Sequence, residues 1–308
     1  MHDRLGRPVL VTGASSGIGW HLAQHLAGMG YPVYATARNE PDIEALGALD
    51  GVTPAMLDVR DPEQIDAARR FVEKQGKGLY GLVNNAGIGG IGGFSTFTDP
   101  DMLEIFDVNV FGPHRVTNSF LSLLLESQGR IVNIGSQGGS ITGRFFGPYT
   151  MTKHALEAYT ESLAAELRPH GVGVSIVQPG GIVSRIDVKS EASTIRRLKS
   201  AQPPFQKEAR EFLELLGKPE SFDETVPESE ANRKPSSAAI VADAVEDALF
   251  SETPRLRYLV GTRWEGDRVI HALVGKLLDA NESPVHGYSR VELIKILDQH
   301  LGERRSGP

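Results

Sequence analysis

Short runs of apolar and β-branched residues recur along the chain and alternate with longer stretches in which apolar residues follow helical spacing. The runs lie at residues 8–12, 32–37, 52–57, 80–84, 130–134, 172–178 and 256–260. Strands that alternate with helix-length segments indicate βαβ units. Within the runs, as in Val9-Leu10-Val11, apolar residues are consecutive, which is typical of a parallel sheet covered by helices on both faces. We therefore predict an α/β fold with a single doubly wound, Rossmann-type parallel sheet of about seven strands.

The same rhythm indicates the domain organisation. It runs without a linker from residue 8 to about residue 183, so we predict a single domain over residues 1–308. Residues 185–234 are rich in Glu, Lys, Arg, Ser and Pro around a helix-patterned stretch at 205–216. We interpret them as a helical lid insertion, with a solvated surface excursion as the open alternative. Residues 262–308 are predicted to form a C-terminal helical extension.

Composition narrows the class of protein. The chain is 40% apolar and 23% charged, which is typical of a folded globular protein. It has no cysteine, which excludes disulfides and thiolate metal sites. With 32 basic and 39 acidic residues the net charge is −7, which argues against nucleic acid or an anionic membrane as a partner. Because no apolar run approaches about 18 residues, we expect no stable membrane insertion and a cytoplasmic protein.

Histidines do not predict a metal site. His21 and His25 have a spacing that a metal could use, but no carboxylate lies beside them in the sequence to complete a site. We expect both on the surface of a helix, and we predict no metal ion.

A glycine-rich turn, Thr12 to Gly19, follows the first predicted strand and precedes a helix-patterned stretch at 20–29. In this context Gly13 permits a tight turn and Gly17 lets the backbone approach a pyrophosphate. Gly19 lets helix and sheet pack closely, and the helix N-terminus attracts the anion. We predict a dinucleotide-binding turn, with an ordinary loop as the alternative. The expected contacts come from Gly13, Ser15, Ser16, Gly17, Ile18 and Gly19.

The end of the second strand bears on the choice of dinucleotide. Folds that select NAD usually carry an acid there, which holds the ribose 2′-hydroxyl. In this chain the position holds Ala37, and Arg38 beside it can pair with a 2′-phosphate through two hydrogen bonds. These residues favour NADP(H) over NAD(H). Asp58, after the third strand, is expected either to accept from the adenine amino group or to cap the next turn.

Candidate catalytic groups gather at the carboxyl edge of the predicted sheet, where ligands bind in such folds. Tyr149 and Lys153 are four residues apart in a helix-patterned stretch, so their side chains share a face. Ser136 follows the fifth strand through Gly135, and the segment 84–87, Asn-Asn-Ala-Gly, ends the fourth strand at the same edge.

This combination resembles the short-chain dehydrogenase/reductase family over about residues 8–261. The matching elements are the glycine turn, the segment 84–87, Asn109 inside a long helix, Ser136, the Tyr149/Lys153 pair and Pro179-Gly180. Ile182 and Ser184 stand where the family commonly has Val and Thr near the nicotinamide carboxamide. The resemblance implies cofactor contacts from Asn85, Ala86, Gly87, Tyr149, Lys153, Pro179, Gly180, Ile182 and Ser184. Residues 33–38 and 257–261 look like the hydroxysteroid and retinol dehydrogenase branch.

The resemblance implies that Tyr149 is the general acid/base, which gives its phenolic proton to a carbonyl oxygen or takes it from an alcohol. A free tyrosine has a pKa near 10, and lowering it by two or three units requires about 3–4 kcal/mol. An ammonium group about 4 Å away supplies that at an effective dielectric near 20, so Lys153 suffices. Lys153 is also expected to bond the cofactor ribose, Ser136 to polarise the substrate oxygen, and Asn109 to hold a water in a proton relay. Pro113, four residues after Asn109, predicts a disrupted helix ladder and a kink.

Two loops are expected to lie over the nicotinamide, where Phe94, Gln137, Phe145 and Phe146 are candidate substrate contacts. They suggest an apolar pocket, although these phenylalanines could instead only pack the loops onto the fold. The branch likeness implies a bulky apolar alcohol or ketone, steroid- or retinoid-like, under residues 185–234. The family also implies a homodimer or homotetramer through helices around residues 101–125 and 149–167.

The sequence thus favours an NADP(H)-dependent oxidoreductase that transfers hydride to a carbonyl or from a secondary alcohol. Two alternatives remain. An NAD(P)-sensing binding module without catalysis would have no need of Ser136, Tyr149 and Lys153. A sugar-nucleotide epimerase uses a related fold and a similar Tyr–Lys pair, but the glycine spacing and the lack of a large C-terminal substrate domain count against it.

Overall fold

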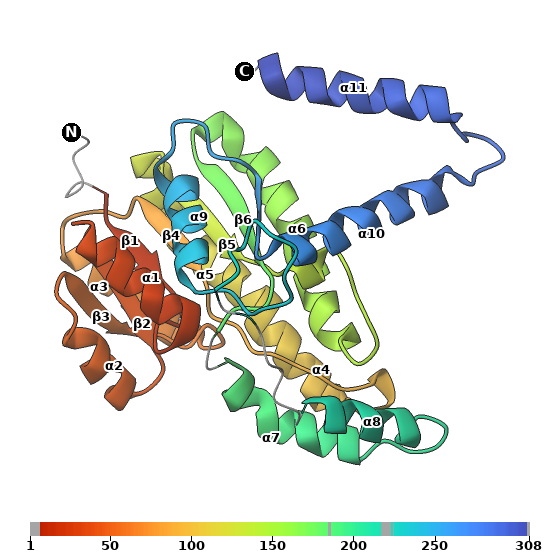
Figure 1. Ribbon diagram of the computed structural model, residues 1–308. Coiled ribbons are helices and arrows are strands. Elements are labelled where there is room, and N and C mark those ends of the chain that lie inside the picture. Colours follow the sequence, from red (N-terminus) through yellow and green to blue (C-terminus); the bar gives the residue numbers. More distant parts are fainter. Residues whose placement is uncertain (1–6, 184–185, 217–222, 224, 307–308) are drawn as a thin grey trace. The chain divides into compact units, whose positions relative to one another are not determined.

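The computed structural model describes residues 7–183, 186–216, 223 and 225–306. The chain divides into two compact units, Met1–Gly266 and Asp267–Pro308. The first contains the sheet and its helices (Figure 1). The second contains α10 (Arg263–Asn281) from Asp267 onward and the whole of α11 (Arg290–Ser306). It falls within the segment that the sequence predicts as a helical extension. Among the described residues, no helix is long and apolar enough to cross a membrane.

One parallel sheet organises the first unit (Figure 1). Its seven strands are β1 Val9–Val11, β2 Val33–Ala37, β3 Val52–Met56, β4 Gly81–Asn84, β5 Arg130–Ile134, β6 Gly173–Pro179 and β7 Arg257–Val260. The order is β3-β2-β1-β4-β5-β6-β7, and every neighbouring pair is parallel. This confirms the predicted Rossmann-type sheet. Because the strand order reverses between β1 and β4, a ligand crevice is expected at their carboxyl ends.

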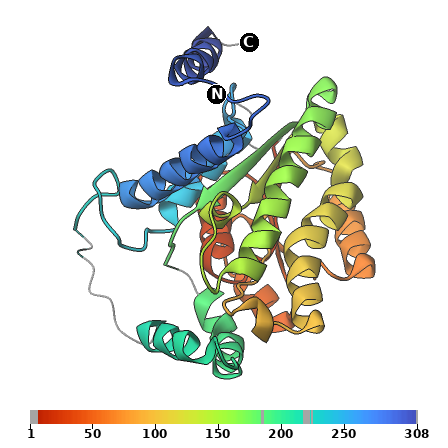
Figure 2. The same ribbon diagram turned by 90° about the vertical axis from the view of Figure 1, so that its right-hand side faces the viewer.

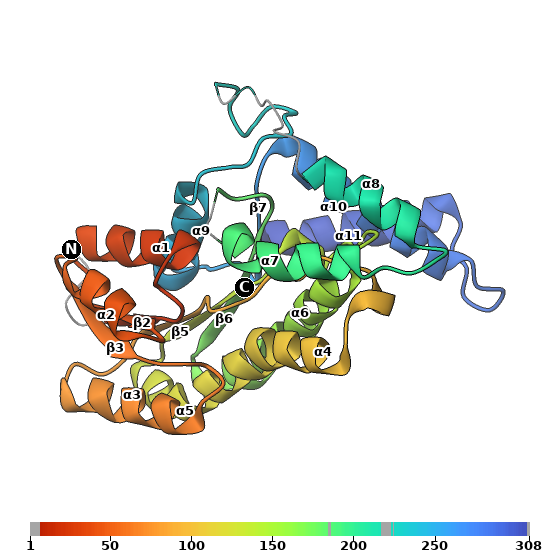
Figure 3. The same cartoon turned by 90° about the horizontal axis from the view of Figure 1, so that it is seen from below.

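Helices cover both faces of the sheet, as Figure 3 shows from below. One layer holds α1 (Gly17–Gly28), α2 (Glu40–Gly47) and α9 (Ala239–Phe250), and the other holds α3 (Pro62–Lys74), α5 (Gly112–Ser127) and α6 (Gly147–Leu167). Val9 and Val11 belong to one hydrophobic core, and Leu10 between them belongs to the other. Successive strand residues point to opposite faces, so two covered faces explain why the strands are apolar at consecutive positions.

The remaining elements lie between β4 and β7. A single 3₁₀ turn, η1 (Phe94–Thr96), precedes α4 (Asp99–Phe106), and a π turn, η2 (Asp107–Phe111), joins α4 to α5. Two more 3₁₀ turns, η3 (Gln137–Gly139) and η4 (Arg168–His170), flank α6. Helices α7 (Ile186–Lys199) and α8 (Gln206–Leu216) lie side by side in the segment interpreted as a lid (Figures 1 and 2). The helix predicted at 205–216 is thus confirmed as α8.

Candidate active site

The glycine turn lies between β1 and the N-terminus of α1. Gly13 has φ +63° and Gly17 has φ +57°, a left-handed backbone that glycine adopts without strain. A Cβ on Gly13 would lie 2.8 Å from the Cα of Ala86, so the turn has no room for a side chain there. The first turn of α1 carries no acidic residue, and Ser16 makes no side-chain capping hydrogen bond. This helix N-terminus fits the pyrophosphate of a dinucleotide.

The segment after β4 braces this turn. The side-chain amide of Asn85 donates to the backbone oxygens of Thr12 at 2.9 Å and Gly13 at 3.1 Å. The backbone N–H groups of Asn85 and Ala86 both donate to the Thr12 hydroxyl at 3.0 Å. The Asn85 side chain therefore acts on the shape of the turn. The other predicted contacts lie along the same two segments, with Ser15, Ser16, Ile18 and Gly87 half-buried and Gly19 buried.

The adenosine end of the predicted site carries two arginines. Arg38 is exposed after the buried Ala37. Asp58 accepts from the backbone N–H of Arg60 at 2.9 Å and from its guanidinium at 2.7 Å. The hydrogen bond from the Arg60 side chain holds the pKa of Asp58 below its ordinary value, assisted by the charge of Arg38 and opposed by partial burial. Asp58 was expected either to accept from the adenine amino group or to cap the next turn, and its hydrogen bond with the N–H of Arg60 matches capping of the turn. Arg60 is a cation in this region that the sequence analysis did not identify.

Ser136 and Tyr149 both lie next to Gly138, just beyond the carboxyl end of β5. Ser136 caps η3 and accepts the backbone N–H of Gly138 at 3.0 Å. Tyr149 lies half-buried in the first turn of α6. A Cβ on Gly138 would lie 3.3 Å from the Ser136 Oγ and 3.6 Å from Cε1 of the Tyr149 ring. The turn η3 and the start of α6 therefore bring the two groups together.

Lys153 lies one helical turn after Tyr149 and is 7% exposed. Its Nζ donates to the backbone oxygen of Ile134 at 2.8 Å and lies 5.7 Å from the centroid of the Tyr149 ring. Burial lowers the pKa of Lys153 to about 8, against a smaller opposing effect of the Glu157 carboxylate. Lys153 is therefore still mainly an ammonium ion at neutral pH, on the same face of α6 as the phenol.

Asn109 lies in the π turn η2 and is 1% exposed. Its Oδ1 accepts the backbone N–H of Ile88 at 2.9 Å, and its amide donates to the Ile88 oxygen at 3.0 Å and to the Thr152 hydroxyl at 3.1 Å. The Thr152 hydroxyl in turn donates to the backbone oxygen of Tyr149 at 2.7 Å. Asn109 thus ties the loop after β4 to the catalytic helix. Pro113 has no N–H to give the carbonyl of Asn109, and the expected disruption takes the form of this π turn.

Three candidate substrate contacts are phenylalanines on the loops beside α6. Phe94 is 60% exposed, and its ring lies against the start of α6 at Gly147. Phe145 has φ +67° and its ring centroid is 4.9 Å from that of Phe212 on α8. The Phe146 ring meets Phe212 edge-on at 6.0 Å. Phe212 was not identified from the sequence, and it makes α8 part of this aromatic cluster.

Gln137 and the turn after β6 share one acceptor. The buried Gln137 amide donates to the backbone oxygen of Val260 at 3.1 Å, and the N–H of Gly180 donates to the same oxygen at 2.8 Å. Ile182 forms a parallel β-bridge with Ser236. The Gln137 side chain therefore holds η3 to β7, and the N–H of Gly180 holds the turn after β6 to the same residue of β7. Pro179 ends β6, and Ser184 lies outside the described residues.

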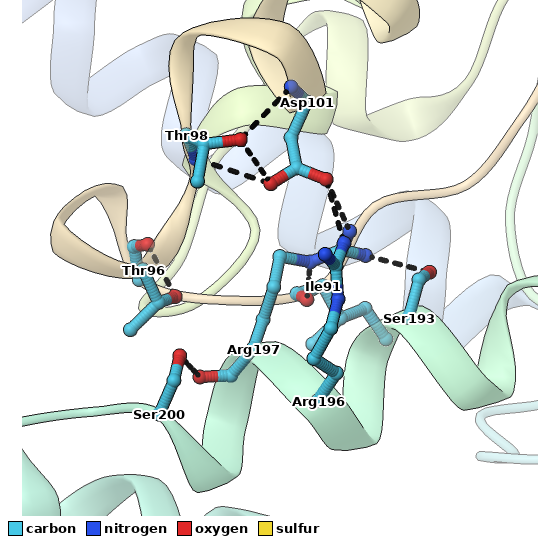
Figure 4. Close-up of polar contacts among 9 residues, drawn as sticks. Ile91, Thr96, Thr98, Asp101, Ser193, Arg196, Arg197 and Ser200 are labelled. Atoms are coloured by element: carbon cyan, nitrogen blue, oxygen red, sulfur yellow. Dashed lines mark hydrogen bonds and ion pairs between the residues drawn. The ribbon is translucent and has the colours of Figure 1, made fainter.

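Figure 4 shows the polar contacts that hold α7 to α4 and to the loop after β4. Asp101 of α4 accepts from the Arg196 guanidinium at 2.7 Å, and the Arg197 guanidinium lies 3.8 Å away. The Arg197 side chain is 6% exposed, donates to the backbone oxygen of Ile91 at 2.9 Å and lies 4.3 Å above the Phe97 ring. Sequence analysis identified none of these residues, because 95 positions separate Arg196 from Asp101 and no local pattern connects them.

The chain is similar to known oxidoreductases over most of its length. It is 33% identical over 265 residues to mitochondrial D-beta-hydroxybutyrate dehydrogenase of Rattus norvegicus, covering 82% of this chain and 76% of the relative. It is 34% identical over 264 residues to retinol dehydrogenase 7 of the same species, covering 82% and 80%. Among solved structures, a variant of actinorhodin polyketide ketoreductase with NADPH matches with a TM-score of 0.69 at 26% identity, covering 86% of this chain and 99% of that one.

These similarities agree with the resemblance to the hydroxysteroid and retinol dehydrogenase branch. The model of the family described as short chain dehydrogenase matches residues 7–194. This range contains the glycine turn, Asn109, Ser136 and the Tyr149/Lys153 pair. The chain therefore belongs to the short chain dehydrogenase family, and it is an oxidoreductase that acts on hydroxyl or carbonyl groups.

Proposed function

We propose that this protein is an NADP(H)-dependent carbonyl reductase or alcohol dehydrogenase in which Tyr149 transfers the proton. The observation that carries the proposal is the convergence of Ser136, Tyr149 and Lys153 at the carboxyl end of β5, with the Lys153 ammonium buried beside the Tyr149 ring. This arrangement supplies a proton donor, a neighbouring cation and a second hydrogen-bond donor at one point.

The cofactor would lie along the carboxyl edge of the sheet. The turn from Gly13 to Gly19 and the N-terminus of α1 fit its pyrophosphate, because the positive φ of Gly13 and Gly17 forms a tight turn without side chains and a helix N-terminus favours an anion. The Pro179–Ile182 turn would face its nicotinamide. When bound, NADP(H) would supply or accept the hydride.

Around the reacting oxygen, this chain would move and hold the proton. The backbone N–H of Gly138 donates to the Ser136 Oγ, which leaves the Ser136 hydroxyl proton to donate to the substrate oxygen. Tyr149 would give its proton to that oxygen during reduction and take it back during oxidation. The Lys153 ammonium favours the phenolate. Since the Asn109 side chain is engaged by Ile88 and Thr152, a relay water would bind to its backbone carbonyl.

Arg38 supports NADP(H) as the preferred cofactor. It is exposed directly after Ala37, where no carboxylate is present to hold the 2′-hydroxyl of NAD or repel a 2′-phosphate. The ketoreductase with NADPH has the same fold. Both observations favour NADP(H).

The aromatic cluster supports a bulky apolar substrate. Phe145, Phe146 and Phe212 bring apolar rings from two segments together, and the exposed Phe94 lies on a neighbouring loop. Retinol dehydrogenase 7 carries the name of such a substrate, whereas D-beta-hydroxybutyrate dehydrogenase carries that of a small hydroxy acid. We therefore propose a bulky apolar alcohol or ketone, and the small hydroxy acid becomes the contrasting arm of the test.

Exposed apolar side chains on α4, η2, α5 and α6 support self-association through these elements. They are Leu103, Phe111, Leu125 and Met151. We propose a cytoplasmic homodimer or homotetramer, which light scattering and fractionation would test.

The function is tested by titrating the protein separately with NADPH and NADH. The preferred cofactor is then assayed in its reduced form with steroid, retinoid, aromatic and aliphatic carbonyls, and in its oxidised form with 3-hydroxybutyrate. We expect tighter binding of NADPH and turnover of a bulky apolar compound. Binding without hydride transfer to any compound would support the sensing module, and conversion of a nucleotide sugar to its epimer would support the epimerase.

A further inference from the structure

The first turn of α10 and the turn after β6 are joined by one carboxylate. Glu265 lies three residues after Thr262 and is 9% exposed. One of its oxygens, Oε2, accepts the backbone N–H of Thr262 at 2.9 Å and the Thr262 hydroxyl at 3.3 Å. The backbone N–H of Glu265 points back to the Thr262 hydroxyl at 3.4 Å. This reciprocal arrangement is a capping box for α10.

The other carboxylate oxygen, Oε1, makes a hydrogen bond that lies outside the helix cap. Oε1 accepts the backbone N–H of Gly181 at 2.6 Å, although 84 positions separate the two residues. The carboxylate also fills the space beside two glycines, because a Cβ on Gly180 would lie 2.4 Å from Oε1 and a Cβ on Gly261 would lie 2.4 Å from Oε2. Glu265 therefore fits directly against the backbone of the turn that follows β6.

Another capping box, formed by Ser289 and Glu292, has an exposed carboxylate and serves for comparison. Glu292 accepts from the backbone N–H of Ser289 at 2.8 Å and from its hydroxyl at 2.7 Å, and its side chain is exposed. Burying a carboxylate is costly unless its hydrogen bonds are strong, and an exposed cap of the Glu292 kind avoids that cost. The burial of Glu265 is thus explained by its bond to Gly181 and not by helix capping alone.

Hydrogen bonds hold both of the peptide groups that meet at Gly181. The N–H of Gly181 is held by Glu265, and its carbonyl accepts the N–H of Ser236 at 2.7 Å. The neighbouring Gly180 donates to Val260. With both polar groups of Gly181 engaged, the turn is ordered before a ligand arrives, which reduces the entropy lost on binding.

We propose that Glu265 is a positioning residue for the nicotinamide end of the cofactor, acting through the Gly180–Gly181 turn. The inference rests on the proposed function, in which this turn faces the nicotinamide. Glu265 itself touches neither cofactor nor substrate. It sets the turn against which the ring is placed, and so affects both cofactor affinity and the rate of hydride transfer.

The variant Glu265→Asp separates the two roles of the side chain. An aspartate at this helix position completes a capping box elsewhere in the chain, as Asp101 does with Thr98. One methylene fewer, however, withdraws the carboxylate from Gly181. Glu292→Asp is the matched control, because it makes the same change in a box whose described contacts are with Ser289. Glu265→Gln, which keeps the length but has one acceptor oxygen, is the second variant.

The readout compares two ligands by calorimetry: NADPH, and 2′-phospho-ADP-ribose, which lacks the nicotinamide. For Glu265→Asp we expect at least fivefold weaker NADPH binding and a lower kcat, with 2′-phospho-ADP-ribose binding within twofold of wild type. Glu265→Gln should change in the same direction, and Glu292→Asp should match wild type. Equal losses for both ligands would indicate a general loss of structure and overturn the inference, as would unchanged NADPH binding in both Glu265 variants. A wild-type protein that binds neither NADPH nor NADH would instead overturn the proposed function, and this inference with it.

Discussion

The charge of Lys153 favours the proposed chemistry, but the burial of that charge costs folding free energy. Its ammonium lies near the Tyr149 ring, where a positive charge favours the phenolate. Burial lowers its pKa from 10.5 to about 8, so folding at neutral pH requires the desolvation of a charged group. The site therefore contains a group that helps the proposed chemistry and costs stability, as is common at active sites.

This cost predicts a pH-dependent stability. Between pH 8 and 10.5 the unfolded chain retains the Lys153 proton while the folded chain has released it, so stability rises with pH in this window. From pH 7 to pH 10 the wild type should gain about 2–3 kcal/mol of unfolding free energy relative to Lys153→Met. Denaturant unfolding of both proteins at the two pH values measures this difference, and parallel pH dependences would contradict it.

Arg38 provides a second prediction at the scale of one side chain. Arg38→Ala should weaken NADPH binding about 10- to 100-fold, since a charge-assisted pair with a 2′-phosphate contributes about 1.5–3 kcal/mol. NADH binding should be unchanged. Arg60→Ala is the control for the loss of a nearby positive charge. It should weaken NADPH binding less than Arg38→Ala does, because the Arg60 guanidinium is bonded to Asp58. Titrations monitored by nicotinamide fluorescence measure the affinity of wild type and of both variants for each cofactor. An equal effect of Arg38→Ala on NADH would show that Arg38 does not select the phosphate.

At the scale of elements, α7 is held by two arginines of different character. The exposed Arg196 lies closer to Asp101, at 2.7 Å, than the buried Arg197, at 3.8 Å. Exposed ion pairs contribute little, whereas Arg197 also bonds Ile91 and stacks on Phe97. Burial raises the pKa of Asp101, but the hydrogen bonds from Thr98 and Arg196 outweigh it and leave the pKa below its ordinary value. Asp101 therefore remains an anion at neutral pH.

Burial, and not distance, should decide which arginine holds α7. We expect Arg197→Ala to speed amide hydrogen exchange in α7 about 5- to 150-fold, because about 1–3 kcal/mol of hydrogen bonding and packing is lost. Arg196→Ala should change exchange less than fourfold. Hydrogen-exchange mass spectrometry of the two variants measures this. Equal effects would contradict this expectation, and a larger effect of Arg196→Ala would mean that the shorter ion pair carries the attachment.

Local patterns predict only part of these elements. The i, i+4 spacing of Tyr149 and Lys153 places both side chains on one face of α6, and Pro113 indicates the disrupted helix at Asn109. The attachment of α7 to Asp101 and the bond of Glu265 to Gly181 have no sequence signature. They join residues 95 and 84 positions apart, respectively, and helical or strand periodicity carries no information about such pairs.

At the scale of the whole molecule, the sheet was predictable because its strands are apolar at consecutive positions. Val9, Leu10 and Val11 require two covered faces, and this requirement determines the layered α/β architecture. The boundary between the two units at Gly266 could not be predicted from the sequence. The helical pattern of α10 runs across that boundary without interruption, so the sequence indicates one continuous helix and gives no sign that a unit boundary falls within it.

The proposed role of Tyr149 is to transfer the proton at a site built by the sheet edge and α6. It is tested most directly by measuring turnover and NADPH affinity of Tyr149→Phe beside wild type. The ring stays and only the hydroxyl is removed, so turnover should be abolished while NADPH affinity stays within about twofold of wild type. Turnover near the wild-type rate in Tyr149→Phe would contradict it.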